Sequence, residues 1–423
     1  MVSPTKKILL TTLLTNACRV MLAIVFMVSG FVKAVDPVGF MYKMKEYAAS
    51  FAVVELADAW WLFGAFLLSA AEFVVGFFLL VGVWRKVVAL LSFVMLLFYA
   101  PLTLYVAMEN PVPDCGCFGD ALRLTNWETF VKNILLLPMS AVVCFKTSLY
   151  RGCIGRASSW MAVLFAISYV CAVEAIGVWH LPVIDFRPYA IGVNLREAVE
   201  DVPSQYEVVS VYEKDGEQRS FSADALPDST WNYIGSTNKL VREARPASVS
   251  DFSFLHRSTG YDVAEDILAD TGYVALVVME SIEKADENRV DKINDLYDYS
   301  CENAMAFYVV TSSSDDVVAT WCKRTGAEYP IYWGDDIALK TMIRANPGLL
   351  LIKDGRVVEK WNITDAPDVD VFASGAQLAS AGGYLEAMRG WGFWLLLFAV
   401  PVAVILFLDM FASAPAKKEE NEE

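Results

Sequence analysis

Six long apolar runs constrain the fold of this chain more than any other feature of its sequence. Each run has roughly the 20 residues that an α-helix needs to cross a bilayer. Hydrophobic residues make up 56% of the 423 residues and charged residues only 20%, unlike a typical soluble domain. The sequence therefore predicts a multi-pass membrane protein that is in contact with the lipid bilayer. The expected spans are 18–35, 61–84, 87–108, 126–145, 159–179 and 391–411, with the residues before Cys18 as an interfacial lead-in.

Positive charges orient these spans. If the N-terminus is cytoplasmic, the inner segments carry ten Lys and Arg residues, whereas the two short outer loops near 36–60 and 109–125 carry three. The positive-inside rule then places both termini in the cytoplasm and residues 180–390 outside it. The inner ten are Lys6, Lys7, Arg19, Arg85, Lys86, Lys146, Arg151, Arg156, Lys417 and Lys418, and the outer three are Lys43, Lys45 and Arg123.

The negative charge of the chain lies in one block. Residues 180–390 contain 35 acidic and 19 basic residues, whereas the rest of the chain contains 15 of each. The whole net charge of −16 therefore belongs to the predicted outer block. Because such a block repels phosphate groups, this distribution argues against a nucleic-acid partner.

The outer block divides into two parts. In 181–245, Asp215-Gly216 separates two alternating runs, which favours a β-hairpin with a type I′ turn, and 230–243 is expected to add a short strand pair. In 246–380, strands at 273–280 and 306–313 alternate with helices, and a final hairpin turns at Asp354-Gly355. This alternation predicts a three-layer α/β domain.

The second part resembles the thioredoxin-like domains of peroxiredoxins and TlpA-type proteins. The resemblance rests on the Asp-Phe pair at 251–252, the apolar run at 273–280 and the segment 346–361, and it implies a cis peptide bond before Pro347. In that family an active-site CxxC follows the central strand. Here the sequence reads Ser281-Ile282-Glu283-Lys284 at that place. The resemblance therefore implies the fold but not the activity.

Cys301 and Cys322 are the cysteines of this outer domain. Free cysteine is commonly buried, so the first interpretation is that both residues pack in the core. An extracytoplasmic location would also permit a structural disulfide between them. A catalytic pair is the third alternative, although neither residue stands where the thioredoxin-like family has its nucleophile.

The strongest chemical signal is Asp114-Cys115-Gly116-Cys117-Phe118-Gly119-Asp120, in the outer loop between the third and fourth spans. A disulfide between cysteines one residue apart closes a small, strained ring, and strain makes a disulfide easier to reduce. This pattern favours thiol–disulfide exchange by Cys115 and Cys117. Because Asp114 and Asp120 oppose thiolate formation, a nearby cation is expected to compensate. An inert structural loop and a zinc site are the alternatives, but the two histidines of the chain lie elsewhere.

Two ionisable residues inside predicted spans need an explanation, because burying a charge there is costly, whereas Glu174 and Asp409 are expected nearer the membrane interfaces. Glu72 is at the middle of the second span, and Lys33 is near the end of the first. Glu72 has three interpretations: a protonated residue hydrogen-bonded within the bundle, a proton-relay or quinone-contact residue, or a partner of Lys33. The predicted depths of the two residues differ, which argues against direct contact between them.

Several separated segments resemble the DoxX/MauE family of four-helix membrane proteins. They are 29–40 (SGFVKAVDPVGF), 71–82 (AEFVVGFFLLVG), the CGCFG loop and the pair Lys132-Asn133. MauE-type members are linked to periplasmic disulfide handling during methylamine dehydrogenase maturation, and DoxX-type members to thiosulfate or quinone-linked oxidation. The resemblance implies a redox-associated bundle, with a membrane quinone as its candidate cofactor.

The predicted fold class is a membrane α-helical bundle with a DoxX/MauE-like four-helix core and six spans, plus an extracytoplasmic α/β thioredoxin-like domain. A capping-box pattern, Thr125 to Glu128, supports the fourth span. The expected parts are 1–150 (bundle), 151–180 (fifth span), 181–245 (hairpin region), 246–380 (thioredoxin-like domain), 390–412 (sixth span) and 413–423 (cytoplasmic tail).

The predicted function is that of a thiol–disulfide oxidoreductase of the inner membrane. Cys115, Cys117 and Glu72 would pass electrons between an extracytoplasmic thiol or disulfide protein and a membrane quinone. A non-catalytic scaffold that presents a redox-inactive thioredoxin-like domain is the alternative from another class. A transporter is the weakest interpretation, since the six uneven spans show no inverted repeat.

Overall fold

The computed structural model describes residues 4–51, 56–112, 114–155, 157–214, 216–222, 225–249, 251–369, 388 and 390–412. The chain divides into two compact units: Met1–Arg187 together with Trp361–Glu423, and Pro188–Lys360. The predictions for Asp215, Arg156 and the tail 413–423 concern positions outside the described residues. The finer domain boundaries expected from the sequence stay predictions.

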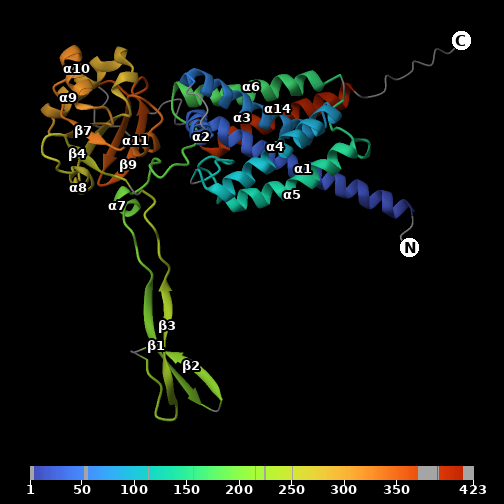
Figure 1. The fold of residues 1–423 in the computed structure, drawn as a ribbon, viewed down its shortest axis with the longest axis horizontal. Helices are drawn as coiled ribbons and strands as arrows, with labels where there is room; N and C mark the ends of the chain where they lie inside the picture. Colours follow the sequence, from blue (N-terminus) through green and yellow to red (C-terminus); the bar gives the residue numbers. More distant parts are fainter. Residues whose placement is uncertain are drawn as a thin grey trace. The chain divides into compact units, whose positions relative to one another are not determined.

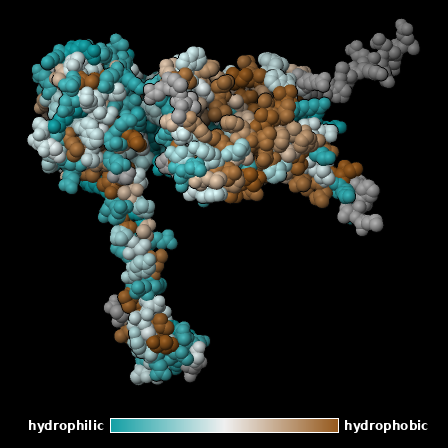
Figure 2. Space-filling view, in the orientation of Figure 1, coloured by the Kyte–Doolittle hydropathy of each residue, from teal (hydrophilic) through white to brown (hydrophobic). Residues whose placement is uncertain are grey.

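The first unit is a bundle of apolar helices (Figure 1). Six helices of the described residues are long and apolar enough to cross a membrane, in agreement with the predicted number of spans. Figure 2 shows apolar residues covering much of the visible face of this unit. Leu67 and Phe98, 63% and 64% exposed, are examples of side chains suited to face lipid. The six are α1 (Pro4–Val35), α3 (Asp58–Val81), α4 (Arg85–Glu109), α5 (Asn126–Phe145), α6 (Ser159–Trp179) and α14 (Trp391–Ala412).

Helix α1 is one continuous helix, so the residues predicted as an interfacial lead-in before Cys18 continue into the first span without a break. Arg19, which the sequence assigned to the inner side, is buried within this helix. Its guanidinium donates to the carbonyl oxygens of Leu79 and Leu80 at 3.3 and 3.4 Å, near the C-terminal end of α3. Without Arg19, nine inner Lys and Arg residues remain against three in the outer loops, so the charge difference between the two sides persists.

A helix absent from the sequence prediction, α2 (Pro37–Ser50), occupies most of the first outer segment. Asp36 caps it, because its Oδ1 accepts a hydrogen bond from the backbone nitrogen of Gly39 at 2.8 Å, and Pro37 suits the first helical position. The capping box predicted for α5 is confirmed, with Thr125 and Glu128 bonding reciprocally. A short 3₁₀ helix, Thr147–Leu149, follows α5.

Helices α1 and α3 approach closely, and this contact sets the register of the bundle. A Cβ atom added to Gly30 would lie 2.3 Å from the backbone nitrogen of Phe73, so no larger residue fits there. Small residues commonly permit such close backbone contact between membrane helices. Because Ser29 and Glu72 adjoin these two positions in sequence, the packing places polar side chains of α1 and α3 beside each other.

Two other carboxylates of the bundle are buried, although the sequence indicated positions near the membrane interfaces. Glu174 accepts a hydrogen bond from the Ser69 hydroxyl at 2.6 Å. Asp409 on α14 accepts one from the backbone nitrogen of Gly155 at 3.0 Å. Both contacts join segments far apart in sequence and stabilise the packing of α6 and α14 in the unit.

The second unit contains a three-stranded antiparallel sheet of order β2-β1-β3 (Figure 1). Its strands are β1 (Gln205–Lys214), β2 (Glu217–Phe221) and β3 (Asn232–Arg242). The predicted hairpin is confirmed, since Lys214 pairs with Glu217 and Gly216 has a φ of +83°. The predicted strand pair at 230–243 was wrong, because β3 is one strand that pairs along β1.

The other sheet has six strands in the order β4-β7-β6-β5-β8-β9. β5 and β7 are parallel to β6, whereas β8 is antiparallel to β5. This mixed sheet, with helices between its central strands, confirms the predicted thioredoxin-like α/β domain, and the Asn346-Pro347 bond is cis as predicted. The strands are β4 (Phe254–His256), β5 (Tyr273–Met279), β6 (Ala306–Thr311), β7 (Ile331–Gly334), β8 (Gly348–Lys353) and β9 (Arg356–Asn362). The helices of this unit are α7 (Leu195–Ala198), α8 (Ala264–Ala269), α9 (Val290–Glu302), α10 (Asp315–Thr325) and α11 (Asp336–Met342), with 3₁₀ turns at Ile282–Lys284 and Glu287–Arg289.

The junction after β5, where thioredoxins carry their thiols, holds a serine–glutamate cluster. The hydroxyls of Ser281 and Ser313 donate to Glu283 Oε2 at 2.8 and 2.7 Å. Cys301 on α9 is exposed and Cys322 on α10 is partly exposed, so the interpretation of both as core residues was wrong. Both thiols are free, so the structural disulfide that the sequence left open as an alternative is not formed.

Candidate functional site

A cavity of about 320 Å³ lies within the helical bundle and brings together the residues that the sequence singled out. Cys115, Cys117, Glu72 and Lys33 all line it. Helices α1 to α5 and the loop before α5 each contribute to its wall. Most of the wall is apolar, including Phe40, Phe51, Trp61, Phe98 and Leu136.

The two cysteines face each other across Gly116. Their Sγ atoms are 3.2 Å apart and both thiols are free. Gly116 has a φ of +65°, and an added Cβ would lie 2.8 Å from Lys43 Cγ. Only glycine combines that backbone conformation with such close approach. The sequence Cys-Gly-Cys is therefore what allows both sulfurs to turn toward the same side of the loop.

Hydroxyl groups of two helices hold this loop at both ends. The Tyr47 phenol on α2 donates to the Cys115 carbonyl oxygen at 2.9 Å. The Ser29 hydroxyl on α1 lies 2.7 Å from the Cys117 carbonyl oxygen and 2.8 Å from Glu72 Oε2. Burial raises the pKa of the Tyr47 phenol well above its usual value, so it stays protonated as a donor. The dithiol is thus held against the bundle by its backbone as well as by its side chains.

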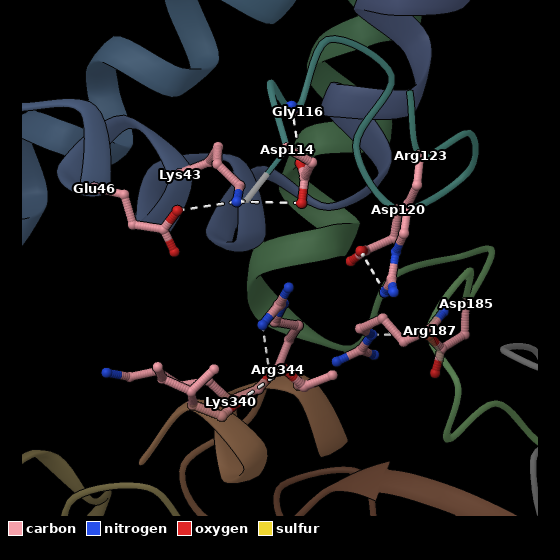
Figure 3. A network of polar contacts seen from close by, with 12 residues as sticks. Lys43, Glu46, Asp114, Gly116, Asp120, Arg123, Asp185, Arg187, Lys340 and Arg344 are labelled. Atoms are coloured by element: carbon pink, nitrogen blue, oxygen red, sulfur yellow. Dashed lines mark hydrogen bonds and ion pairs between the residues drawn. The ribbon is translucent and has the colours of Figure 1, made fainter. Parts of the chain in front are cut away.

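Salt bridges reduce the unfavourable effect that the two aspartates near the dithiol have on thiolate formation (Figure 3). Lys43 Nζ lies between Glu46 and Asp114, at 2.9 and 3.5 Å from their carboxylate oxygens. Asp114 Oδ1 also accepts a hydrogen bond from the Gly116 nitrogen at 3.0 Å. Asp120 pairs with Arg123 at 3.0 Å. Asp114 and Asp120 therefore contribute to the shape of the loop and lie in ion pairs.

Glu72 and Lys33 form a buried ion pair, so the expectation that they lie at different depths was wrong. Lys33 Nζ is 2.7 Å from both carboxylate oxygens of Glu72. The Tyr99 phenol on α4 donates to Glu72 Oε1 at 2.7 Å. Of the three interpretations of Glu72, these contacts support the one in which it is the partner of Lys33.

The two thiols are electrostatically unequal. The hydrogen bond from Cys115 stabilises a thiolate at Cys117 and outweighs its burial, and the cations of Lys132 and Lys33 add to the effect, so that the pKa of Cys117 falls to about 6. The same bond and burial raise the pKa of Cys115 above its usual range. The site therefore favours a thiolate at Cys117 over one at Cys115. Lys132 and Lys33 are the compensating cations that the sequence required.

Sequence reasoning missed several residues of this site. Ser29 and Tyr47 carry no local signal, because their roles depend on contacts with positions far away in the chain. Tyr99 is one of several aromatic residues in α4 and looks like a packing residue. Lys132 entered only through the family resemblance, although a lysine within a span was itself a signal.

Comparison with protein families agrees with this geometry. Residues 11–146 match the family described as methylamine utilisation protein MauE. The membrane bundle is MauE-like. This MauE-like region includes α1 to α5 and the dithiol loop. The DoxX half of the predicted resemblance stays a prediction.

Other comparisons add less. Residues 206–243, which include β1 to β3, match a family described as a domain of unknown function, DUF8463. No curated protein matches the chain. A solution structure from Bacteroides thetaiotaomicron, whose description suggests a protein disulfide isomerase, is 18% identical over 35% of this chain and 92% of that one, with a TM-score of 0.24. That likeness is too low to support an argument about function.

Proposed function

We propose that this MauE-like membrane protein is a thiol–disulfide oxidoreductase whose redox centre is the Cys115–Cys117 pair. The observation that carries the proposal is the position of the dithiol. Its sulfurs lie 3.2 Å apart on the wall of a cavity in the bundle, beside two ammonium groups. A lowered thiol pKa and an adjacent second thiol are what exchange chemistry requires.

The reaction has a defined balance. Joining Cys115 and Cys117 breaks no bond between heavy atoms, forms one S–S bond and releases two electrons and the protons still held by the thiols. The reverse reaction takes two electrons from an extracytoplasmic dithiol. A membrane quinone is the proposed acceptor on the other side of the cycle, because it takes up two electrons and two protons.

The volume and the lining of the cavity support the proposal of a quinone site. Its wall is mainly aromatic and aliphatic, and Tyr99 and Lys33, which both donate to Glu72, line it as well. Apolar walls with a few convergent polar groups are typical of small-molecule sites. Glu72 lies next to both donors and is proposed to take up or release protons during turnover.

The direct test uses the purified full-length protein in detergent, with dithiothreitol as electron donor and a short-chain quinone as acceptor. We expect quinone reduction above the uncatalysed rate, and its loss in both Cys115→Ser and Cys117→Ser. Cys301→Ser and Cys322→Ser are the matched controls and should keep full activity, since these thiols lie in the second unit. Equal rates in all four variants and the wild-type protein would contradict the proposal.

The proposed location is the bacterial inner membrane, with both termini in the cytoplasm and residues 180–390 outside. The support is the distribution of Lys and Arg between alternate segments. A periplasm-dependent reporter fused after Asp251 is therefore expected to be active, and a cytoplasm-dependent reporter inactive. The opposite pattern, with a fusion after Lys86 as a control for the inner side, would reverse this topology.

A scaffold is the second candidate function. The observation that favours it is the junction after β5, where Ser281 and Glu283 occupy the place of the thioredoxin thiols. In that case the α/β domain binds a partner without redox chemistry, and the bundle anchors it. The scaffold predicts that a protein lacking both loop cysteines works normally in cells.

A further inference from the structure

The charges around the cavity balance in only one redox state of the dithiol. Lys33 is neutralised by Glu72 at 2.7 Å. Lys43, beside the loop, is neutralised by Glu46 and Asp114. Lys132 on α5 also lines the cavity, but among the described residues it has no carboxylate within ion-pair distance. Its Nζ lies 4.5 Å above the ring centroid of Phe118, in the same loop as the cysteines.

Cys117 is the loop residue whose ionisation would supply a negative charge near Lys132. Both residues line the cavity, and the Lys132 charge contributes to the lowered pKa of Cys117. When the dithiol becomes a disulfide, this negative charge disappears and the partly buried ammonium is left without a counter-charge. Leaving a charge in an apolar environment without a partner is unfavourable. The arrangement therefore stabilises the reduced loop relative to the oxidised one.

Stabilisation of the reduced form has a direct redox consequence. A disulfide whose dithiol form is stabilised takes electrons more readily, so it is a stronger oxidant. In addition, a thiol with a lower pKa leaves faster when its disulfide is attacked. Both effects involve the same cysteine, because Cys117 is the one whose thiolate is stabilised.

We propose that Lys132 makes the Cys115–Cys117 disulfide an oxidant of extracytoplasmic protein dithiols, with Cys115 as the sulfur attacked and Cys117 as the leaving sulfur. This inference deepens the proposed function and depends on it. It assigns the direction of electron flow, from a reduced dithiol substrate into the bundle. Lys132 is a positioning residue, which acts through the charge of Cys117.

The exchange balances as follows. A substrate thiolate attacks Cys115 Sγ, an intermolecular S–S bond forms, and the loop S–S bond breaks to release the Cys117 thiolate. The second substrate thiol loses its proton and attacks the substrate sulfur of the mixed disulfide. The substrate leaves as a disulfide and Cys115 leaves as a thiol after taking up that proton. Two electrons have then moved from the substrate to the loop.

The surroundings of Cys117 must be controlled in any test that changes a charge. The titratable and charged groups of the site come from every element around the cavity: Lys33 on α1, Tyr47 on α2, Glu72 on α3, Tyr99 on α4, Lys132 on α5, and Cys115 in the loop. Lys132→Met removes the charge at similar length, Lys132→Gln is a second uncharged variant, and Lys132→Arg keeps the charge. Lys45→Met is the matched control, because Lys45 pairs with Asp58 and does not line the cavity.

The experiment equilibrates full-length protein in glutathione buffers and measures the oxidised fraction of the loop by alkylation and mass spectrometry. For Lys132→Met and Lys132→Gln, half-oxidation is expected at an about tenfold lower ratio of oxidised glutathione to reduced glutathione squared, a fall of about 30 mV in potential. Lys132→Arg and Lys45→Met should match the wild-type protein. When the wild-type disulfide is reduced with limiting glutathione and quenched with acid, the mixed disulfide should carry glutathione on Cys115 and far less on Cys117.

Two results would overturn the inference alone: an unchanged midpoint in both uncharged variants, or glutathione trapped mainly on Cys117. A wild-type loop that forms no disulfide in any buffer would instead overturn the proposed function, and the inference with it. A midpoint that falls in Lys132→Met but also falls equally in Lys45→Met would show a general charge effect and would likewise contradict the role of Lys132.

Discussion

Glu72→Gln is expected to lower the free energy of unfolding by about 3–5 kcal/mol, because it leaves the Lys33 ammonium buried without its counter-charge. Glu72 and Lys33 are both buried, and the Nζ of Lys33 contacts both carboxylate oxygens of Glu72. The variant keeps the size of the side chain, so lost packing does not account for the change. Chemical unfolding of the full-length protein in detergent measures the difference.

Two further variants separate the charge effect from other causes. Lys33→Met combined with Glu72→Gln removes both charges and should recover most of the lost stability, since a neutral pair no longer needs compensation. Glu46→Gln removes a carboxylate from the partly exposed pair with Lys43 and should cost about 1 kcal/mol or less. A Glu72→Gln protein as stable as the Glu46→Gln protein would contradict the buried ion pair.

The double variant also tests function apart from stability. Lys33→Met alone is the reference, because Lys33 also contributes to the lowered pKa of Cys117. If Glu72 only stabilises the bundle, the double variant should turn over as fast as this reference. The proposed protonic role of Glu72 instead predicts a stable protein with slow quinone reduction and a loop that still forms its disulfide.

The sequence was a good guide where local pattern decides the structure. The apolar runs predict the spans because their length matches a bilayer. The capping box at Thr125 and Glu128 marks the start of α5, since those two side chains satisfy backbone groups of the first turn. The buried strands β5 and β8 follow from continuous apolar runs of the length of a strand.

The sequence was a poor guide where the structure depends on distant contacts. Helix α2 mixes polar and apolar residues, so it resembles a loop when only spans are sought. Residues 230–243 looked like a short strand pair, but pairing with β1 makes β3 one continuous strand. The contact between Lys33 and Glu72 depends on how α1 packs against α3 at Gly30, which predicted span limits do not show.

The sequence predicted some features of the dithiol site and missed others. Cys115 and Cys117 were identified from their spacing alone, and the need for a compensating cation follows from the two flanking aspartates. Which cation supplies it could not be predicted, because Lys132 meets the loop only in the folded bundle. The difference in pKa between Cys115 and Cys117 could not be predicted either, because it also depends on contacts that form only in the folded bundle.

Cys115→Ser and Cys117→Ser are each expected to abolish activity in cells, and the double variant should be no worse than either single one. Groups that share one mechanism show this non-additivity. The redox account requires that each variant is present in the membrane at normal abundance. If the pair were only structural, either substitution would also give the same loss as both together, but through a loss of folded protein. Cys301→Ser combined with Cys322→Ser, at free cysteines of the other unit, should have no effect.

Thiol trapping in intact cells tests the central claim most directly. Cells are shifted between oxidising and reducing growth conditions, quenched with acid and alkylated, and the state of residues 115–117 is read by mass spectrometry. We expect the loop to change between a disulfide and an alkylated dithiol with the conditions, and to accumulate as the dithiol when quinone oxidation is blocked. A loop that stays in one state under every condition would contradict a redox role for the Cys115–Cys117 pair.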